Sequence, residues 1–415
     1  MKVLFFAWTS LNPHTSAYGY GGGGWIAALQ RELNAKGIEL GYTYLSDKDE
    51  WFKHDGFSYY GVKRENKGIK EKLLVGLNPK DTSFEAKRDD ICLKKFAAVV
   101  EDFQPDVIHI FGSEQCYGLI TKYTKVPVVI HLQGLLNSCW NAVLAPGVSL
   151  STYCLQTLNP KKIWSRYQEY MEWYRTCARE REILRNCKYF IGRTDWDRCC
   201  TSVLTKDYRY FYGSEMLRTE FHNAPERVQP EKLTIVTTIS GALYKGYDMI
   251  LKTAKILKDN IGDNFTWKVF GSVEPDFYEK MLGIKHEDVN VELCGVAKPA
   301  QLVEAFSKCT TYFHSSYIEN SSNAISEAQL SGCPIVACYI GGNDTLVKHG
   351  EEGLLVPAND PYMAAARVIQ LYENRELNKR MGEASKATAS KRHDRETIVN
   401  GLIDIYKQII ETEKA

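Results

Sequence analysis

Two glutamates stand close enough in the sequence to share one site. Glu319 and Glu327 are separated by seven residues in the string ENSSNAISE, and Glu319 follows an expected strand, Thr310–His314, through a short loop. Three good N-cap residues for a helix carrying Glu327 lie between them: Ser321, Ser322 and Asn323. Two carboxylates at the carboxyl end of a strand suit sugar hydroxyls, because each can accept two hydrogen bonds. The plainer alternative is a surface Glu and a Glu that favours a helix dipole.

A lysine and a histidine also follow expected strands. Lys245 lies in the string KGYD after the strand Leu233–Ile239, where its charge could reach a phosphate. His131 closes the string VPVVIH, where it could form a hydrogen bond with a substrate. The alternatives are a solvated turn lysine and a satisfied histidine of the core.

A run of glycines, Gly19–Gly24, matches the pattern G-x-G-x-x-G. In a dinucleotide-binding fold the first glycine follows the strand at once, but here ten residues separate it from Trp8. Asp47, at the end of the second expected strand, nevertheless keeps a nicotinamide-binding fold open. The glycines precede an expected helix at Trp25, whose free N–H groups could hold an anion, unless the run is only a flexible loop.

Two Asp-x-Asp strings, Asp47–Asp49 and Asp195–Asp197, could hold a divalent metal beside a nucleotide diphosphate. Strings this short recur by chance, and the presence of two copies favours chance. We therefore expect no metal site.

The elements that would position these side chains alternate between strand and helix along the whole chain. The expected strands are Val3–Trp8, Ile38–Leu45, Asp106–Phe111, Val126–His131 and Lys188–Gly192, then Leu233–Ile239, Thr266–Phe270, Val289–Leu293, Thr310–His314 and Pro334–Cys338. A polar linker at 223–232 separates the two arrays. The sequence therefore predicts an α/β fold of two doubly wound Rossmann-like domains facing a cleft, over residues 1–225 and 232–396. An amphipathic helix at about 397–415 could pack back on the first domain.

Composition excludes several functional classes. The chain has 415 residues with 52 Lys and Arg against 51 Asp and Glu, and its net charge of +1 gives no general field for nucleic acid. No window approaches 18 apolar residues, and the first apolar run is too short for a signal peptide. The twelve cysteines are scattered without zinc-like spacing, as expected in a reducing cytoplasm.

One segment departs from this balance. Residues 161–200 hold 3 Lys and 7 Arg against 4 Glu and 2 Asp, among many aromatic side chains. A solvated helix face is the plain interpretation, and the alternative is a surface that contacts the acceptor or a membrane.

Residues 233–358 hold several strings in a characteristic order, namely KGYD, VFGS, CGV, YIENSSNAISEAQLSGCPIVA and IGGNDTLVKHGEEGLLVP. With them the chain resembles the glycosyltransferases of the two-Rossmann-domain type, GT-B, and within that type the retaining transferases of glycosyltransferase family 4. The N-terminal half is similar only through its glycine-rich loop, His131 and the Asn-Ala-Pro linker. Such halves bind the acceptor and diverge freely.

The resemblance implies roles for matched positions. Lys245 matches the lysine that neutralises the donor diphosphate, and Glu319 matches the carboxylate near the donor sugar and the reaction centre. Glu327 matches the carboxylate that holds the ribose hydroxyls. Gly23 and Gly24 match the loop that faces the diphosphate.

Two further matches and two departures complete this comparison. His131 matches a histidine near the transferred sugar, and Gly295 lies where the base is usually held by backbone. Ser240 stands where the family often has an arginine, five residues before the lysine, which leaves the leaving group with one cation fewer. Arg193 is a candidate substitute. The glycines that usually follow the first Glu are replaced, and the expected donor pocket here includes Asn320, Ser321, Ser322 and Asn323.

The resemblance thus implies a metal-independent, retaining transfer of a sugar from a UDP-type or GDP-type nucleotide sugar to an acceptor hydroxyl, without a cofactor. A glycan or lipid-linked acceptor, a role in surface polysaccharide or glycoconjugate assembly, and a cytoplasmic location with peripheral membrane contact follow as expectations. Two alternatives stay open: a nicotinamide-dependent oxidoreductase, and a non-catalytic protein that binds sugar nucleotides.

Overall fold

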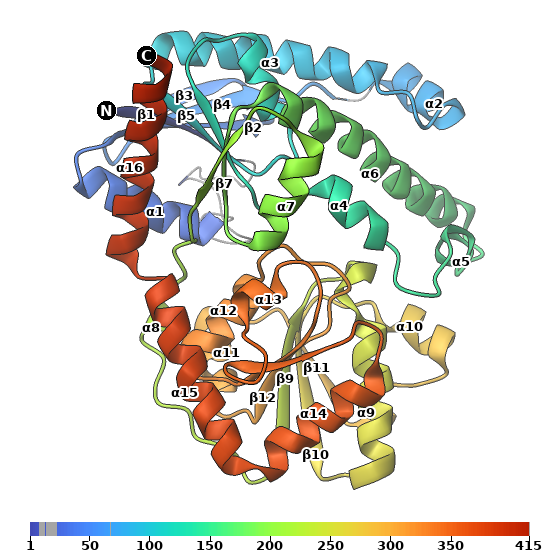
Figure 1. Ribbon diagram of the computed structural model, residues 1–415. Coiled ribbons are helices and arrows are strands. Elements are labelled where there is room, and N and C mark those ends of the chain that lie inside the picture. Colours follow the sequence, from blue (N-terminus) through green and yellow to red (C-terminus); the bar gives the residue numbers. More distant parts are fainter. Residues whose placement is uncertain (8–12, 14–22, 67, 415) are drawn as a thin grey trace. The chain divides into compact units, whose positions relative to one another are not determined.

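The computed structural model describes residues 1–7, 13, 23–66 and 68–414. Within them the chain forms two compact units, each built on one sheet (Figure 1). Unit 1 comprises Met1–Trp140, Thr157–Met216 and Asp394–Ala415, and unit 2 comprises Asn141–Gln156 and Leu217–His393. The predicted α/β fold with two doubly wound Rossmann-like halves is confirmed. The glycines at 19–22 lie outside the described residues.

The sheet of unit 1 has the strand order β3-β4-β2-β1-β5-β6-β7-β8, and every neighbouring pair is parallel except β3 with β4. Its strands are β1 (Lys2–Phe6), β2 (Glu39–Ser46), β3 (Glu50–His54), β4 (Phe57–Lys63), β5 (Val107–Phe111), β6 (Val128–His131), β7 (Tyr189–Gly192) and β8 (Arg209–Tyr212). The chain order reverses between β1 and β5, which makes the carboxyl ends of these strands the place where an open α/β sheet binds ligands.

Helices cover both faces of this sheet. Val3 and Phe5 of β1 pack in the cluster that includes α1 and α16, whereas Leu4 and Phe6 pack in the cluster that includes α3 and α6. Burial on both faces explains the unbroken apolar run at the start of the sequence. The helical segments of unit 1 are α1 (Gly23–Ala35), α2 (Ile69–Leu77), α3 (Ser83–Phe103), η1 (Cys116–Lys122), α4 (Leu136–Cys139), α6 (Pro160–Asn186), α7 (Asp195–Leu204) and α16 (Arg395–Lys414).

The sheet of unit 2 is parallel throughout, with the order β11-β10-β9-β12-β13-β14. Its strands are β9 (Leu233–Ile239), β10 (Phe265–Gly271), β11 (Val291–Gly295), β12 (Thr311–His314), β13 (Ile335–Cys338) and β14 (Gly353–Val356). The order reverses between β9 and β12, and the side chains that follow these two strands therefore flank the switch point.

The chain enters unit 2 earlier than the linker at 223–232, because the units divide between Met216 and Leu217. The segment 141–156 also belongs to unit 2, where Ala145 and Val148 join its core. Its helical segments are α5 (Leu150–Cys154), α8 (Thr219–His222), η3 (Leu243–Lys245), α9 (Tyr247–Ile261), α10 (Pro275–Leu282), η4 (Glu287–Val289), α11 (Pro299–Ser307), α12 (Asn323–Leu330), α13 (Asn343–Leu346), α14 (Pro361–Glu373) and α15 (Arg375–Arg392), while η2 (Trp140–Ala142) spans the boundary.

The last helix, α16, returns to unit 1. It contributes Val399, Leu402, Ile405, Tyr406 and Ile409 to the same apolar cluster as β1 and α1. The Tyr406 hydroxyl lies 2.5 Å from Nδ1 of His109, a buried residue of β5. The end of the chain is therefore part of the core that its first residues begin.

Candidate functional site

Lys245 and Glu319 meet at the switch point of unit 2. Lys245 ends η3, just after β9, and Glu319 lies in the loop after β12. The lysine Nζ is 2.5 Å from Oε2 of Glu319, and both side chains are about one-fifth exposed. The pair joins two residues 74 positions apart at the place where strand order predicts a ligand site.

The loops that carry this pair are bonded to each other. Gly246 has a φ of +74°, and a Cβ there would lie 2.2 Å from the carbonyl oxygen of Ser315. The Ser315 hydroxyl donates to the Lys245 carbonyl at 2.7 Å, and the Tyr317 N–H donates to the Tyr244 carbonyl, also at 2.7 Å. Only glycine fits this contact, and the close approach fixes where Lys245 stands.

A third loop, which follows β13, contacts the backbone of Glu319. Gly341, after β13, has a φ of +51°, and a Cβ at this position would lie 1.7 Å from the Glu319 carbonyl oxygen. The Gly342 N–H donates to the same oxygen at 3.1 Å. The backbone of Glu319 is thus held at a set place, which is what a preorganised carboxylate needs.

A buried histidine lies beside the pair, and the pair affects its pKa. Burial lowers the pKa of Lys245, but the adjacent Glu319 carboxylate outweighs this effect, so the net pKa is raised and the amine is charged. His314, the last residue of β12, has Nε2 at 3.8 Å from Glu319 Oε2. Burial, assisted by the Lys245 charge, lowers the pKa of His314 to about 4, against the opposing effect of Glu319. The histidine is therefore neutral at pH 7 while Lys245 is paired.

Glu327 has a different partner. It lies on α12, whose N-cap residue Ser322 accepts from the Ile325 N–H, and it is 7% exposed. Arg218 donates from Nε to Oε1 at 2.9 Å and from Nη2 to Oε2 at 2.8 Å. The two hydrogen bonds from the planar guanidinium fix the orientation of this carboxylate.

The other expected residues of this half lie at the same edge of the sheet. Ser240 follows β9 and is exposed, and Gly295 ends β11 with a φ of +68° and is also exposed. The residues after Glu319 are Asn320 and Ser322, which are buried, and Ser321 and Asn323, which are partly exposed. The structure therefore brings the expected donor residues of unit 2 to one edge.

The remaining expected residues belong to unit 1. Gly23 and Gly24 form the start of α1. His131 ends β6 in an aromatic cluster with Trp25 and His109, and burial lowers its pKa well below the usual range. Neither ring nitrogen of His131 has a hydrogen-bond partner among the described residues.

Arg193 is engaged inside unit 1. It is 5% exposed, its Nη1 lies 2.6 Å from Glu215 Oε2, and its Nη2 donates to the Leu132 and Gln133 carbonyls at 3.3 Å. These contacts occupy the guanidinium and disfavour the idea that it replaces the cation missing at Ser240.

Aspartates of both Asp-x-Asp strings bind other groups of unit 1. Asp49 accepts from the Lys63 N–H at 2.7 Å and pairs with Lys95 at 2.8 Å. Asp197 is buried and accepts from the Arg193 N–H at 3.0 Å and from the Tyr210 hydroxyl, while Asp195 pairs with Arg198. No group of three His, Cys, Asp or Glu side chains suited to a metal ion occurs in the described part of the chain.

Three cations of the segment 161–200 have partners inside unit 1. Arg175 pairs with Glu85 at 2.8 Å and Arg179 with Asp89 at 3.3 Å, in addition to the buried Arg193. Five others are exposed, namely Lys161, Lys162, Arg185, Lys188 and Arg198, so only part of the local excess of positive charge is internal. None of the helices over the described ranges has the length and apolar character needed to cross a membrane.

Two residues of the site escaped the sequence analysis. His314 closes a predicted strand, as His131 does, so its position in the string TYFH was a usable signal. Arg218 lies 109 positions before its partner Glu327, outside any strand or helix, and no pattern in the sequence marks it.

Comparison with known proteins adds to this geometry. Residues 219–388 match the family model of glycosyl transferases group 1. D-inositol 3-phosphate glycosyltransferase of Corynebacterium glutamicum is 28% identical over 158 residues, 36% of this chain and 38% of the relative. An uncharacterized glycosyltransferase of Methanocaldococcus jannaschii is also 28% identical, over 40% of this chain and 48% of the relative. The chain thus matches about half or less of the length of these curated relatives.

Solved structures extend the likeness to the whole chain. Sucrose-phosphate synthase from Thermosynechococcus elongatus has a TM-score of 0.72 and 14% identity, covering 99% of this chain and 100% of the other. Anabaena HepE, solved in complex with UDP and glucose, has a TM-score of 0.64 and 14% identity, covering 98% and 100%. These likenesses show the fold, the family match supports glycosyl transfer, and neither favours the oxidoreductase. The chain has the GT-B architecture, and most of its second unit matches the group 1 glycosyl transferases.

Proposed function

We propose that this protein transfers a sugar from a nucleotide-diphosphate sugar to an acceptor hydroxyl with retention of the anomeric configuration, as transferases of family 4 do. The observation that carries the proposal is the Lys245–Glu319 pair, which lies at the switch point of the parallel sheet inside the region matched by the family model. HepE, a structural neighbour, was solved with UDP and glucose, and we extend this to a UDP-sugar donor here.

In this proposal Lys245 exchanges partners during the reaction. Glu319 holds the amine in place without donor, and an arriving diphosphate, with more negative charge, takes it over. The departing diphosphate gains charge in the transition state, where a preorganised lysine lowers the barrier, and this supports chemistry without a divalent metal. Only the lysine side chain changes partner in this step. The backbone of its loop stays in place, because Gly246 and Ser315 already fix it.

Glu319 is then released toward the sugar. As the ring becomes oxocarbenium-like, a carboxylate beside it stabilises the positive charge or holds the ring hydroxyls. The pKa of His314, whose Nε2 lies 3.8 Å from Glu319 Oε2, rises once the lysine charge has moved away. Glu327, oriented by the two hydrogen bonds from Arg218, would hold the ribose hydroxyls.

The experiment is steady-state kinetics with UDP-sugars and a hydroxyl acceptor, using three variants. We expect Glu319→Gln to lower kcat and Glu327→Gln to raise KM while kcat holds, because ribose contacts change little during the reaction. If Glu327→Gln lowers kcat as much as Glu319→Gln does at saturating donor, the division of roles is wrong. The third variant, Lys245→Ala, should lower kcat most, because it removes the cation beside the leaving diphosphate.

Two further measurements address the finer parts of the proposal. Proton NMR of the first-formed product gives the anomeric configuration, and inversion would overturn the retaining mechanism. Activity in excess EDTA tests metal independence, and a loss that Mg²⁺ restores would overturn it. A sugar-nucleotide-binding protein without activity would show binding of the donor but no turnover.

The acceptor, the place of action and the role in surface polysaccharide or glycoconjugate assembly are proposals of the same kind. Membrane contact rests only on the exposed start of α6, where Lys161 and Lys162 precede Trp164, which is 51% exposed. Flotation of the protein with anionic and neutral vesicles at low salt tests this contact. Equal recovery of the protein with both kinds of vesicle would mean that this surface is a solvated helix face.

A further inference from the structure

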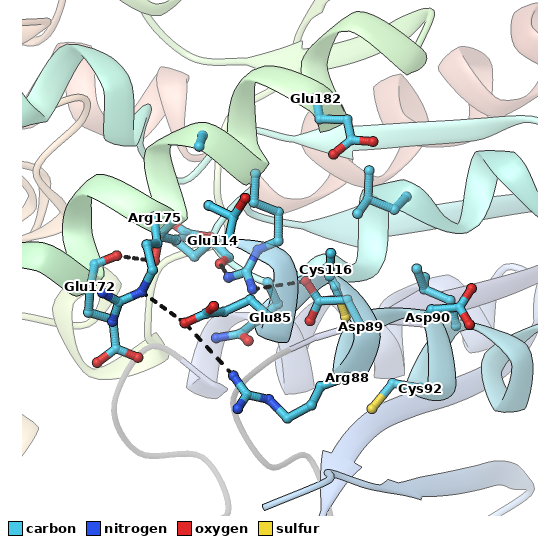
Figure 2. A pocket seen from close by; sticks show the side chains of 18 of the residues that line it. Glu85, Arg88, Asp89, Asp90, Cys92, Glu114, Cys116, Glu172, Arg175 and Glu182 are labelled. Carbon is cyan, nitrogen blue, oxygen red and sulfur yellow. Dashed lines mark hydrogen bonds and ion pairs between the residues drawn. The ribbon is translucent and has the colours of Figure 1, made fainter. Parts of the chain in front are cut away.

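Unit 1 contains a pocket of about 670 Å³ among α3, η1 and α6 (Figure 2). Its lining includes Leu45, near the end of β2, Glu114, in the loop after β5, and Leu136, the first residue of α4 after β6. The pocket therefore reaches the carboxyl edge of the sheet. Its volume is that of an ordinary small-molecule site.

Ion pairs between the two long helices hold the walls of the pocket in place. Arg175 of α6 donates from Nε to Glu85 Oε1 at 2.8 Å and from Nη1 to the Pro79 carbonyl at 2.7 Å, and Figure 2 shows this arginine directed at Glu85. Arg179, one turn further along α6, donates from Nη1 to Asp89 Oδ2 at 3.3 Å. These bonds join residues 90 positions apart and leave the polar groups of the wall preorganised.

Two polar atoms of these same side chains have no partner. Glu85 Oε2 and Arg179 Nε are buried, and neither forms a hydrogen bond with any described residue. One atom is an acceptor and the other is a donor, and leaving either of them buried and unpaired is costly. A hydroxyl group both donates and accepts, so a molecule with several hydroxyls can satisfy the two together.

The charge of the lining restricts the ligand further. Seven carboxylates line the pocket against five cations. Three of the cations, Arg88, Arg175 and Arg179, pair with carboxylates of α2 or α3, and Lys122 pairs with Glu182. The fifth cation, Arg64, forms no ion pair with a described residue, so an anionic ligand would meet seven acidic side chains and a single unpaired cation. The pocket therefore disfavours phosphates and carboxylates and favours an uncharged molecule.

An aromatic side chain completes the lining. Trp173 of α6 lies on the pocket, on the same helix as Arg175 and Arg179. A flat indole ring provides a large apolar face, and the C–H face of a sugar ring is the apolar part of an otherwise hydroxyl-rich molecule.

We propose that this pocket binds a neutral, hydroxyl-rich group of the size of a mono- or disaccharide. Naming that group as the acceptor end of the transfer reaction rests on the proposed function, whereas the binding itself does not. The proposed ligand of this chain is uncharged. It therefore differs from the anionic inositol phosphate in the name of the relative from Corynebacterium glutamicum.

Saturation-transfer NMR on the full chain tests the proposal. The neutral probes are maltose, cellobiose, lactose and N,N′-diacetylchitobiose, and the anionic probes are D-inositol 3-phosphate and glucose 6-phosphate. Trp173→Leu and Glu85→Gln alter the pocket. Trp164→Leu removes an exposed tryptophan of the same helix that does not line the pocket, and Glu411→Gln removes an exposed carboxylate of α16, so these two variants are the matched controls.

We expect at least one neutral disaccharide to receive saturation, and its affinity to fall about fivefold or more in both pocket variants but not in the controls. The proposal is overturned if no neutral probe binds, if an anionic probe binds more tightly than all neutral ones, or if binding is unchanged in Trp173→Leu. That variant keeps all the ion pairs, so it answers the question even if Glu85→Gln folds poorly.

UDP is added to the same samples as an independent probe of unit 2. Disaccharide binding without UDP binding would retain the pocket and count against the proposed donor. A second outcome is that UDP binds and an acceptor is turned over, but the acceptor KM is unchanged in Trp173→Leu and Glu85→Gln. This would support the transfer reaction and show that the pocket does not bind the acceptor.

Discussion

The site of unit 2 and the pocket of unit 1 are built in different ways. In unit 2 the reactive pair stands directly after two neighbouring strands, on loops joined by backbone contacts at Gly246 and Gly341. In unit 1 the polar groups stand on the faces of two long helices and are fixed by side-chain ion pairs such as Arg175–Glu85. The first design depends on where strands end, and the second on which faces of two helices meet. We expect substitutions to affect rate in unit 2 and stability together with ligand binding in unit 1.

The largest effect is expected for Lys245→Ala. Loss of one preorganised charge beside the leaving group commonly costs on the order of 10²–10³ in rate, and the exposed Ser240 in place of an arginine favours the upper part of this range. The measurement is kcat with a UDP-sugar, and Lys255→Ala, which breaks an exposed pair with Asp259, is the control. Near wild-type turnover in Lys245→Ala would mean that the donor site has been placed wrongly.

A stability effect comes next, in unit 1. Arg175 is 4% exposed and bridges Glu85 and the Pro79 carbonyl, so Arg175→Ala leaves the largely buried Glu85 carboxylate with only Arg88, 4.0 Å away, as a cation. Removing one partner of a buried pair costs about 3–5 kcal/mol, and the partial exposure of Glu85 places the expected loss near ~3 kcal/mol. Urea unfolding measures it.

The comparison variant is Arg198→Ala, whose pair with Asp195 is exposed and is expected to contribute at most about 1 kcal/mol. Equal losses in the two arginine variants would show that the ion pairs between α3 and α6 do not stabilise unit 1.

Gly246→Ala is expected to affect both properties in unit 2. A Cβ would lie 2.2 Å from the Ser315 carbonyl oxygen, and the residue would keep a left-handed φ, so a loss of about 1–3 kcal/mol in unfolding free energy is expected, together with lower kcat. Gly262→Ala also has a left-handed φ, +63°, but meets nothing within 4 Å. If the two variants are equally stable, the contact between the loops is not what fixes Lys245.

The smallest effect concerns pH. Burial, with a contribution from Glu180, raises the pKa of Glu114 to about 7. When folding raises the pKa of a carboxyl group, the folded state retains the proton to higher pH than the unfolded state does. The folded protein therefore loses stability as the pH rises from about 4.5, the pKa in the unfolded chain, toward 7. Glu114→Gln should therefore gain stability relative to the parent chain between pH 5 and 7.5, on the order of 1 kcal/mol since the pocket is open to water. Thermal unfolding at the two pH values measures this, and a constant difference would contradict it.

The sequence predicted the fold where apolar runs are long and end at a clear signal. Burial on both faces makes β1 an apolar run, and β9 is rich in the β-branched residues Ile, Val and Thr; both were found. The hairpin of β3 and β4 was missed although Asp55-Gly56, both at positive φ, stands between two aromatic runs and is a strong turn signal. The edge strands β8 and β14 were missed, although strands of the same length inside the sheets, such as β6 and β13, were predicted.

The site in unit 2 followed from the same logic, because a residue just after a parallel strand is placed by the strand. This is why Lys245 and Glu319 could be expected together in spite of the distance in sequence. Arg218 and the walls of the pocket in unit 1 could not be expected, since they depend on how irregular segments and helix faces meet. For the same reason the sequence could not show that Arg175 and Arg179 of α6 are internal partners of α3 and not part of a solvated helix face.

The return of α16 to unit 1 has a consequence for synthesis on the ribosome. Unit 2 is complete in the nascent chain once residue 393 has emerged, whereas unit 1, begun by the first strand to be made, lacks part of its core until Tyr406 and Ile409 follow. During translation the later unit can therefore finish first. Until then the apolar face that α16 covers is unprotected, and this interval is when a holding chaperone would matter most.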